Sequence, residues 1–438
     1  MEFLGAPTPF AAPAAGTVTV YSGATLLDGH GGPAVPGTSI VVDGERIRLV
    51  CPDADLPSDL PDLDVVERVD LTGRFVIPGL IDTHQHLATP PDRPVAEAVL
   101  RRQVFGGVTA IRDMADDLRQ IGDLARATRV GEIPGPDIHY AALMAGPGFF
   151  DDPRTWEVSK GAVPGAVPWM QAITEDTDLP LAVAMARGTG ATAVKIYADL
   201  PAETVAAITA EAHRQGLRVW AHAAVFPASP ADVVAAGADV VSHVTLLAHQ
   251  ASAALGPATY KHKPPIDFPA FAAGDHPVIE ALLADMRERG VVLDATAVLW
   301  TWLADRVPEE RAEDRAHALD MAALAATLTR QAHRAGVEIS AGTDYETSAG
   351  EDHPALIEEI EFLVAECGLS VAQALRSATL VGARGIGAEA EMGTVEAGKL
   401  ANLVILAADP EADVAALRGV LCTVKRGLRF PAPTTNKD

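Results

Sequence analysis

The stretch FVIPGLIDTHQHL, residues 75–87, joins an apolar run to two histidines that are separated by a single residue. Side chains two positions apart in a strand point to the same face of the sheet. His84 and His86 are therefore expected to project side by side from the end of a strand, within reach of one metal ion. The alternative interpretation is a pair of polar residues that merely ends a strand.

A repeating pattern continues from this stretch through the middle of the chain. Helix-like segments end at a glycine, which is a common residue at the end of a helix, and an apolar segment with a polar end follows. Strands that alternate with amphipathic helices indicate parallel β/α units. Eight strands are predicted: the segment 76–86 and those that begin near residues 106, 136, 190, 216, 237, 290 and 336.

Eight β/α units predict a (β/α)8 TIM barrel over residues 76–387, with a last helix at residues 370–387. The active site of such a barrel lies at the C-terminal ends of its strands. The flanks, residues 1–75 and 388–438, contain short strand-like segments with glycine turns. Together they are expected to form a small β-sandwich domain built from both chain ends, with the acidic segment 56–70 in it or on its surface.

Composition excludes several classes of partner. Of the 438 residues, 34 are basic and 59 acidic, and the net charge of −25 argues against nucleic acid and against anionic membrane surfaces. The chain has no run of 18 apolar residues, so no membrane span is predicted. Residues 1–16 lack the features of a signal peptide. Three scattered cysteines suggest neither a disulfide framework nor a zinc cluster, and we expect a cytoplasmic protein: Cys51, Cys367 and Cys422.

Polar residues gather at the predicted C-terminal ends of five strands. Imidazole and carboxylate groups in such a set suit zinc and similar divalent ions. A lysine inside a barrel is costly unless it is paired. Taken singly, each residue has a plainer interpretation, such as a satisfied core histidine, a turn cap or a salt bridge. The set comprises His84 and His86 on the first strand, Lys195 on the fourth, His222 on the fifth, His243 on the sixth and Asp344 on the eighth.

The chain resembles the amidohydrolase superfamily of metal-dependent hydrolases. The resemblance covers nearly the whole chain, and its first and last motifs are specific in combination. It implies a composite β domain from both termini, which agrees with the flanks. Besides the strand-end residues, the matching pieces are PGLIDTHQH (78–86), GVTAIRD (107–113) and GTVEAGKLANLVIL (393–406).

The resemblance implies two divalent metal ions, most readily zinc, and a role for each of their ligands. His84 and His86 would bind the buried ion together with Asp344. Lys195, carboxylated by CO2, would bridge the two ions, and His222 and His243 would bind the more exposed one. A hydroxide that bridges the metals would be the nucleophile. Asp344 would accept its proton and pass it to the leaving group.

The segment 194–223 is similar to the Xaa-Pro dipeptidase and imidazolonepropionase-related branch of that superfamily. This similarity implies hydrolysis of an amide or peptide bond in a small-molecule substrate, a dipeptide or an N-acyl amino acid. Around His243 the sequence VVSHVTLL departs from many relatives, which leaves the substrate open. The alternatives are a cyclic amide, lactone or carbamate hydrolase, a mononuclear centre with uncarboxylated Lys195, and, remotely, a non-catalytic scaffold. Relatives commonly assemble, so a homo-oligomer is an expectation of the same kind.

Three further groups are candidates around the site. Tyr197 follows Lys195 by two residues and therefore faces the same way, where it either contacts substrate or packs at the rim. His139, taken to end the third strand, is a weaker substrate-binding candidate. Arg112 and Asp113 are expected to pair with each other or with a neighbour.

Two insertions follow predicted strands and are either lids or surface segments. The first, residues 146–170, is rich in Gly, Pro and aromatic residues, and the second is residues 259–268. The basic cluster Lys261, His262 and Lys263 in the second either attracts a carboxylate-bearing substrate or decorates the surface. Trp300 and Trp302, after the seventh strand, either line an apolar subsite or pack in the core.

Overall fold

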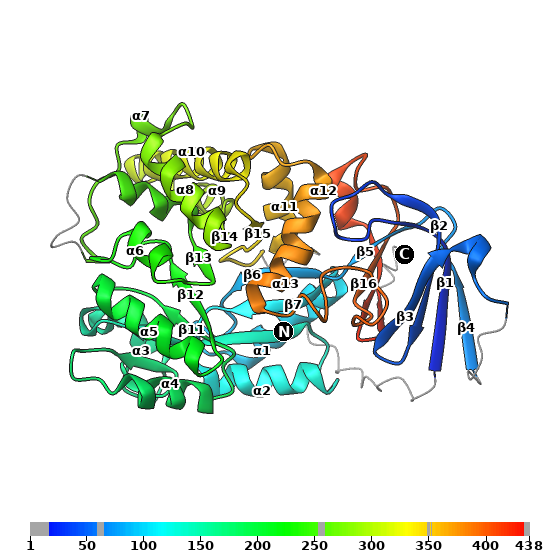
Figure 1. The fold of residues 1–438 in the computed structure, drawn as a ribbon, viewed down its shortest axis with the longest axis horizontal. Coiled ribbons are helices and arrows are strands. Elements are labelled where there is room, and N and C mark those ends of the chain that lie inside the picture. The colour runs from blue at the N-terminus through cyan, green and yellow to red at the C-terminus, as the bar shows by residue number, and fades with distance from the viewer. Residues whose placement is uncertain (1–16, 59–64, 253–258, 348–350, 352, 433–438) are drawn as a thin grey trace.

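The computed structural model describes residues 17–58, 65–252, 259–347, 351 and 353–432. A barrel of strands surrounded by helices lies beside a separate sheet, whose dark blue and red colours in Figure 1 show that both ends of the chain contribute to it. The segment 1–16, for which no signal peptide is expected, lies outside the described residues, as does part of the acidic segment 56–70.

The predicted barrel is confirmed. Its eight parallel strands, among the described residues, pair in sequence order. The last and first strands meet where the backbone N–H of Thr83 donates to Ala341 at 3.0 Å and that of Asp344 donates to His84 at 2.9 Å. The strands are β6 (Leu80–Gln85), β7 (Val108–Asp113), β8 (Asp137–Ala145), β11 (Ala193–Ile196), β12 (Arg218–His222), β13 (Val240–Ser242), β14 (Val292–Asp294) and β15 (Ile339–Ser340).

Helices cover the outside of the barrel, as the glycine-terminated pattern predicts. Gly290 and Gly336 end two of them with φ of 70° and 78°, values that favour glycine. The helices are α1 (Arg93–Phe105), α2 (Leu118–Arg129), α3 (Pro153–Val158), α4 (Leu179–Gly188), α5 (Ala202–Arg214), α6 (Pro230–Ala235), α7 (Phe268–Phe271), α8 (Pro277–Arg289), α9 (Leu299–Arg306), α10 (Ala312–Ala335) and α11 (Ala355–Ala365).

The last predicted helix, residues 370–387, is present in three joined pieces. They are α12 (Val371–Arg376), a π-helical turn (Ser377–Val381) and α13 (Gly382–Ile386). The carbonyl of Ser377, in the π-helical turn, accepts a hydrogen bond of 3.3 Å from the backbone N–H of Ala341, just after β15. Among the helices of the described residues, none combines the length and the apolar character needed to cross a lipid bilayer.

The predicted small β domain from both chain ends is also present. Its strands lie in the order β18-β17-β16-β5-β1-β2-β3, with β4 parallel to β1, so that the two chain ends meet where β5 pairs with β16. The strands are β1 (Thr17–Leu26), β2 (Val35–Asp43), β3 (Arg46–Pro52), β4 (Val65–Asp70), β5 (Phe75–Pro78), β16 (Leu403–Leu406), β17 (Val420–Lys425) and β18 (Leu428–Pro431).

The single strand predicted over residues 76–86 is in fact two strands in two different sheets. β5 belongs to the end sheet and β6 to the barrel, and Gly79 lies between them. A Cβ atom at Gly79 would lie 2.2 Å from Oγ1 of Thr109, so no larger residue permits this close approach. The strand that carries His84 therefore begins directly at the junction between the barrel and the end sheet.

A buried group of charges also joins the two sheets. Asp137, at the start of β8, forms ion pairs with Lys425 at 2.9 Å and with Arg426 at 2.7 Å, both from the end sheet and its following turn. All three side chains are at most 9% exposed. Burial alone would raise the pKa of Asp137, but the two cations outweigh it and lower that pKa to about 2.

Replacing Asp137 with Asn should destabilise the protein by about 3–5 kcal/mol, because buried Lys425 loses its counter-ion and Arg426 keeps only Glu45, whose side chain is 56% exposed. The midpoint of urea unfolding, followed by tryptophan fluorescence, measures this loss. Glu132→Gln is the matched control, since its partner Arg126 is half exposed and such pairs contribute about 1 kcal/mol or less. Equal midpoints for the two variants would contradict a stabilising role for Asp137.

Candidate metal centre

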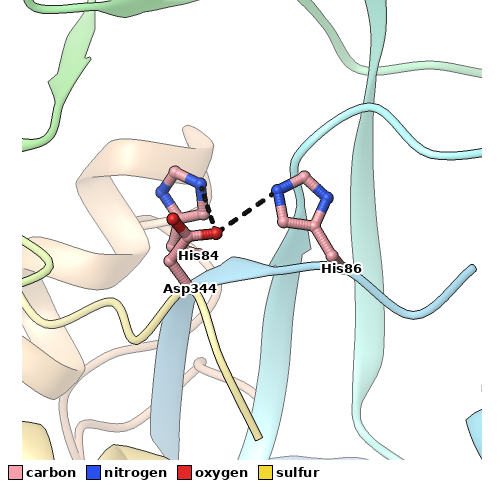
Figure 2. Close-up of side chains that lie close together, drawn as sticks. All are labelled: His84, His86 and Asp344. Carbon is pink, nitrogen blue, oxygen red and sulfur yellow. Dashed lines mark ion pairs between the residues drawn. The ribbon is translucent and has the colours of Figure 1, made fainter. Parts of the chain in front are cut away.

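Three predicted ligands converge at the C-terminal end of the barrel. His84 lies in β6, His86 follows its last residue, and Asp344 follows β15 on the neighbouring side of the barrel. One ligand atom from each lies within 4.8 Å of the other two. Nε2 of His84 lies 3.6 Å, and Nε2 of His86 lies 3.5 Å, from Oδ1 of Asp344, and Figure 2 shows the three side chains turned toward one another.

Each of these histidines is oriented by a buried carboxylate on its other ring nitrogen. Nδ1 of His84 lies 2.6 Å from Asp294, and Nδ1 of His86 lies 2.7 Å from Asp116. A carboxylate accepts the Nδ1 proton and leaves the lone pair of Nε2 directed at Asp344. Nε2 of His84 has no hydrogen-bond partner among the described residues. With both rings neutral, two lone pairs and a carboxylate oxygen thus face one another, an arrangement that a metal ion or a proton on His86 would stabilise.

The spacing of the three groups fits a metal ion. Two ligand atoms of a tetrahedral ion, with bonds of about 2.1 Å, lie about 3.4 Å apart. The separations of 3.6 Å and 3.5 Å are close to that value. Burial and the charge of Lys195 hold the pKa of His84 well below its usual range, so this ring is neutral as a ligand must be. Burial also lowers the pKa of His86, but Asp116 and Asp344 outweigh it, and the pKa of His86 is raised. The two carboxylates therefore favour a positive charge on or beside the His86 ring.

The two orienting carboxylates are residues that sequence reasoning missed. Asp294 ends β14 in the segment GVVLDATAV, so it shows the same strand-end signal as the predicted ligands. It also accepts hydrogen bonds from Arg112 and Ser242, both at 2.7 Å. Asp116, in contrast, follows β7 by three residues and carries no comparable signal. Arg112 and Asp113 are expected from the sequence to pair with each other or with a neighbour. The structure shows the second arrangement, because each forms hydrogen bonds to neighbouring residues and not to the other.

The remaining predicted ligands lie beside this trio. His243 follows β13 with its ring centre 4.8 Å from that of His84 and with Nδ1 3.9 Å from Asp344. His222, the last residue of β12, lies 4.8 Å from the His243 ring. It is buried, and neither of its ring nitrogens has a hydrogen-bond partner among the described residues. Unpartnered buried nitrogens of this kind also fit a metal ligand.

Lys195 lies in β11 and is buried in the same region. Its Nζ is 5.0 Å from the centre of the Tyr197 ring, and both side chains line the cavity over the trio. Burial lowers the pKa of Lys195 to about 8, against the opposing charge of Asp344. An amine with such a pKa is uncharged in an appreciable fraction of molecules near neutral pH, and only the uncharged amine can react with CO2.

A cavity of about 830 Å³ opens over the candidate ligands. Both insertions that the sequence left open line it, the first through residues such as Phe149 and Arg154 and the second through Tyr260 and Lys263. Residues 253–258, just before the second, lie outside the described part of the chain. Trp300 and Trp302 line the cavity as well, and for them the subsite interpretation is the better one.

The two predicted substrate contacts differ in their placement. Tyr197 lines the cavity, and its ring centre is 4.0 Å from that of His222. The placement of His139 at the end of the third strand is wrong, because the apolar segment that follows continues β8 to Ala145. His139 is therefore in the first half of the strand, away from the residues that line the cavity, where its charged neighbours include Asp137.

A family model for the amidohydrolase family matches residues 75–429. An imidazolonepropionase from Micrococcus luteus is 26% identical over 428 residues, which cover 89% of this chain and 92% of that protein. Other imidazolonepropionases, such as one from Cereibacter sphaeroides at 41% identity, align over only 14% of this chain and 14% of their own length.

Two solved structures share the fold over almost the whole chain. A Xaa-Pro dipeptidase with bound methionine has a TM-score of 0.73 at 22% identity, and the match covers 94% of this chain and 100% of that one. A candidate prolidase from Bifidobacterium longum has a TM-score of 0.70 at 25% identity, with 95% and 96% of the two chains covered.

Replacing Asp116 with Asn should weaken zinc binding by about 10- to 100-fold, because a neutral amide holds the Nδ1 proton of His86 less firmly than a carboxylate does. Competition with a chromophoric chelator measures the affinity. Asp178→Asn is the control, since Asp178 caps α4 and Asn is an equally good cap. An unchanged zinc affinity for the Asp116 variant would show that the carboxylate does not support a ligand.

Proposed function

The chain belongs to the amidohydrolase family, and from this premise we propose that it is a metal-dependent hydrolase that cleaves an amide or peptide bond in a dipeptide or an N-acyl amino acid. The observation that carries the proposal is the trio of His84, His86 and Asp344, with its ligand-like spacing of 3.5–3.6 Å. Catalysis, rather than a scaffold role, is supported because every residue of the six-member set predicted from the sequence is present beside or within this trio.

We assign the inner ion to the trio and a second ion to His222 and His243. Lys195, carboxylated by CO2, would hold both, and its lowered pKa of about 8 supports that reaction. Zinc suits this set of imidazole and carboxylate donors best. When bound, such ions polarise the scissile carbonyl and lower the pKa of an attacking water. The mononuclear alternative differs only in leaving Lys195 uncarboxylated and the second position empty.

Asp344 is the residue best placed to move the proton. Its carboxylate lies 3.5 Å and 3.6 Å from the inner histidines and 3.9 Å from His243, and it lines the cavity. Burial raises the pKa of Asp344, although His86 and Lys195 act in the opposite direction. A carboxylate of raised pKa is a better proton acceptor. Asp344 would therefore accept a proton from the attacking water and deliver it to the leaving nitrogen.

Tyr197 is the candidate for contact with the substrate carbonyl. Its ring lies against His222, and its hydroxyl shares a hydrogen bond with that of Tyr260. The partner hydroxyl fixes the phenol in one orientation at the wall of the cavity. Tyr197 has a single proton, so it would donate to the developing oxyanion by turning that proton from Tyr260 to the substrate.

The comparisons support a small amide substrate without naming it. The dipeptidase and the candidate prolidase favour a peptide-like compound, and the cavity of about 830 Å³ is in the size range of small-molecule sites. The full-length match to an imidazolonepropionase favours the second candidate, hydrolysis of a cyclic amide. A cytoplasmic location is part of the proposal, and Cys51, Cys367 and Cys422 are all free thiols in keeping with it.

Removing the metal should abolish hydrolysis, and restoring zinc should recover it. The measurement is turnover of a panel of Xaa-Pro and other dipeptides, N-acyl amino acids, cyclic amides and lactones before and after chelation, with metal content determined in each sample. Release of a free amino acid that needs metal supports the leading proposal. Metal-dependent opening of cyclic substrates alone would favour the second candidate, and full turnover by metal-free protein would contradict both.

Replacing Asp344 with Asn should lower kcat by about 10²- to 10⁴-fold, because the amide cannot accept the proton of the attacking water. Circular dichroism and thermal unfolding should match the wild type. Asp178→Asn again serves as the remote control. Near-normal turnover in the Asp344 variant would eliminate its proposed role.

A further inference from the structure

The cavity over the candidate metal centre has two unlike walls. One wall carries Arg154 from the first insertion and Lys263 from the second, together with Tyr197 and Tyr260. The other wall is formed by α9 and α10 with the start of α7, and its side chains are mostly apolar: Phe268, Trp300, Trp302, Leu303 and Met321. A substrate that fills the cavity therefore meets both a positive charge and an apolar surface.

Lys263 is a cation that faces this cavity without a counter-ion. Its Nζ lies 3.8 Å from the centre of the Tyr260 ring, and no carboxylate of the described residues forms an ion pair with it. The Tyr260 ring in turn stacks on that of His222, with centres 5.6 Å apart and planes 29° apart. The charge therefore lies one aromatic ring beyond a candidate metal ligand. In a chain with a net charge of −25, an unneutralised cation in this position is notable.

The other charged groups of the cavity leave this positive charge uncompensated. Asp152 forms an ion pair with Arg154, whose Nη2 lies 2.8 Å from it. Asp116 is hydrogen-bonded to His86. Asp344 belongs to the metal trio. His249 is a further polar residue that lines the cavity; it is 2% exposed and has an Nδ1 without a hydrogen-bond partner among the described residues. Burial and the charge of Lys263 lower the pKa of His249 to about 4, so His249 is neutral.

The apolar wall begins beside the catalytic aspartate. The ring of Trp302 lies 4.8 Å from that of Tyr345, the residue after Asp344. Farther along, the rings of Phe268 and Trp300 both contact His317, at 5.9 Å and 6.1 Å. A large apolar acyl group can pack against these aromatic rings, whereas a small one would leave most of them uncovered.

We propose that this cavity selects N-acyl amino acids with a large apolar acyl group, and that Lys263 is the residue that recognises their carboxylate. The inference rests on the proposed amide hydrolysis and specifies its substrate class. The carboxylate pairs with Lys263 and is flanked by Arg154 and His249. The acyl group lies against Trp300 and Trp302, and the scissile amide between them reaches the metal trio. Small dipeptides leave the apolar wall unfilled and are poor substrates.

The test compares N-(2-naphthoyl) amino acids with their carboxamide counterparts, which lack the negative charge. Lys263→Met should raise KM for the acids by about 10- to 100-fold, the range expected for a lost charge-assisted hydrogen bond, with kcat little changed. It should leave KM for the carboxamides unaltered. Lys261→Met is the matched control, since both lysines are exposed in the same segment but only Lys263 lines the cavity. N-acetyl amino acids, which lack the large acyl group, should have a KM at least about tenfold higher than the naphthoyl compounds.

The outcomes separate this inference from the proposed function. If the wild type hydrolyses acids and carboxamides equally well, or if the Lys263 and Lys261 variants behave alike, amide hydrolysis stands and the carboxylate subsite is wrong. If no compound is hydrolysed, calorimetric titration with the same intact compounds follows. Binding of the acids that is weakened in the Lys263 variant alone would support the subsite and contradict the proposed function. Absence of both turnover and binding would overturn the two together.

Discussion

The candidate site depends on a repulsion between two imidazole lone pairs and a carboxylate, which a bound metal ion would relieve. Asp294 and Asp116 fix the protons of His84 and His86 on Nδ1, at 2.6 Å and 2.7 Å, and so turn both Nε2 lone pairs toward the carboxylate of Asp344. His84 is fully buried, and its Nε2 finds no hydrogen-bond partner among the described residues. A divalent ion would convert the mutual repulsion into three bonds, which would explain the two buried carboxylates behind the histidines.

The closure of the barrel brings these groups together. Asp344 comes from the last strand and the histidines from the first, more than 250 residues earlier, and two backbone hydrogen bonds join the segments. Gly342 makes this contact possible, because a Cβ there would lie 2.2 Å from Oδ1 of Asp294 and 2.9 Å from Cβ of His84. Gly79 plays a similar part at the other end of β6, where it lets the chain pass from the end sheet into the barrel. Small residues at these two points thus allow the geometry of the candidate metal ligands.

Periodicity predicted the barrel, and strand ends predicted much of the site, because the C-terminal ends of parallel strands meet on one face. Asp294 also lies at the end of a strand. Position alone, however, does not distinguish a residue that orients a metal-binding histidine from one that only packs in the core. Asp116 lies in a loop, where no period constrains side-chain direction, and sequence reasoning had no means to find it. For His139 the predicted position is wrong. A continuous apolar segment does not indicate where a strand ends, and His139 lies in the first half of β8 rather than at its end.

Diffraction from crystals grown with zinc, measured on both sides of the zinc absorption edge, tests the central claim most directly. If the trio is a metal site, an anomalous peak is expected among Nε2 of His84, Nε2 of His86 and the carboxylate of Asp344. A second peak between His222 and His243 would establish a two-metal centre, and its absence would leave a mononuclear one. Zinc bound only elsewhere in the crystal, with no peak at the trio, would contradict the claim that these three side chains form a metal site.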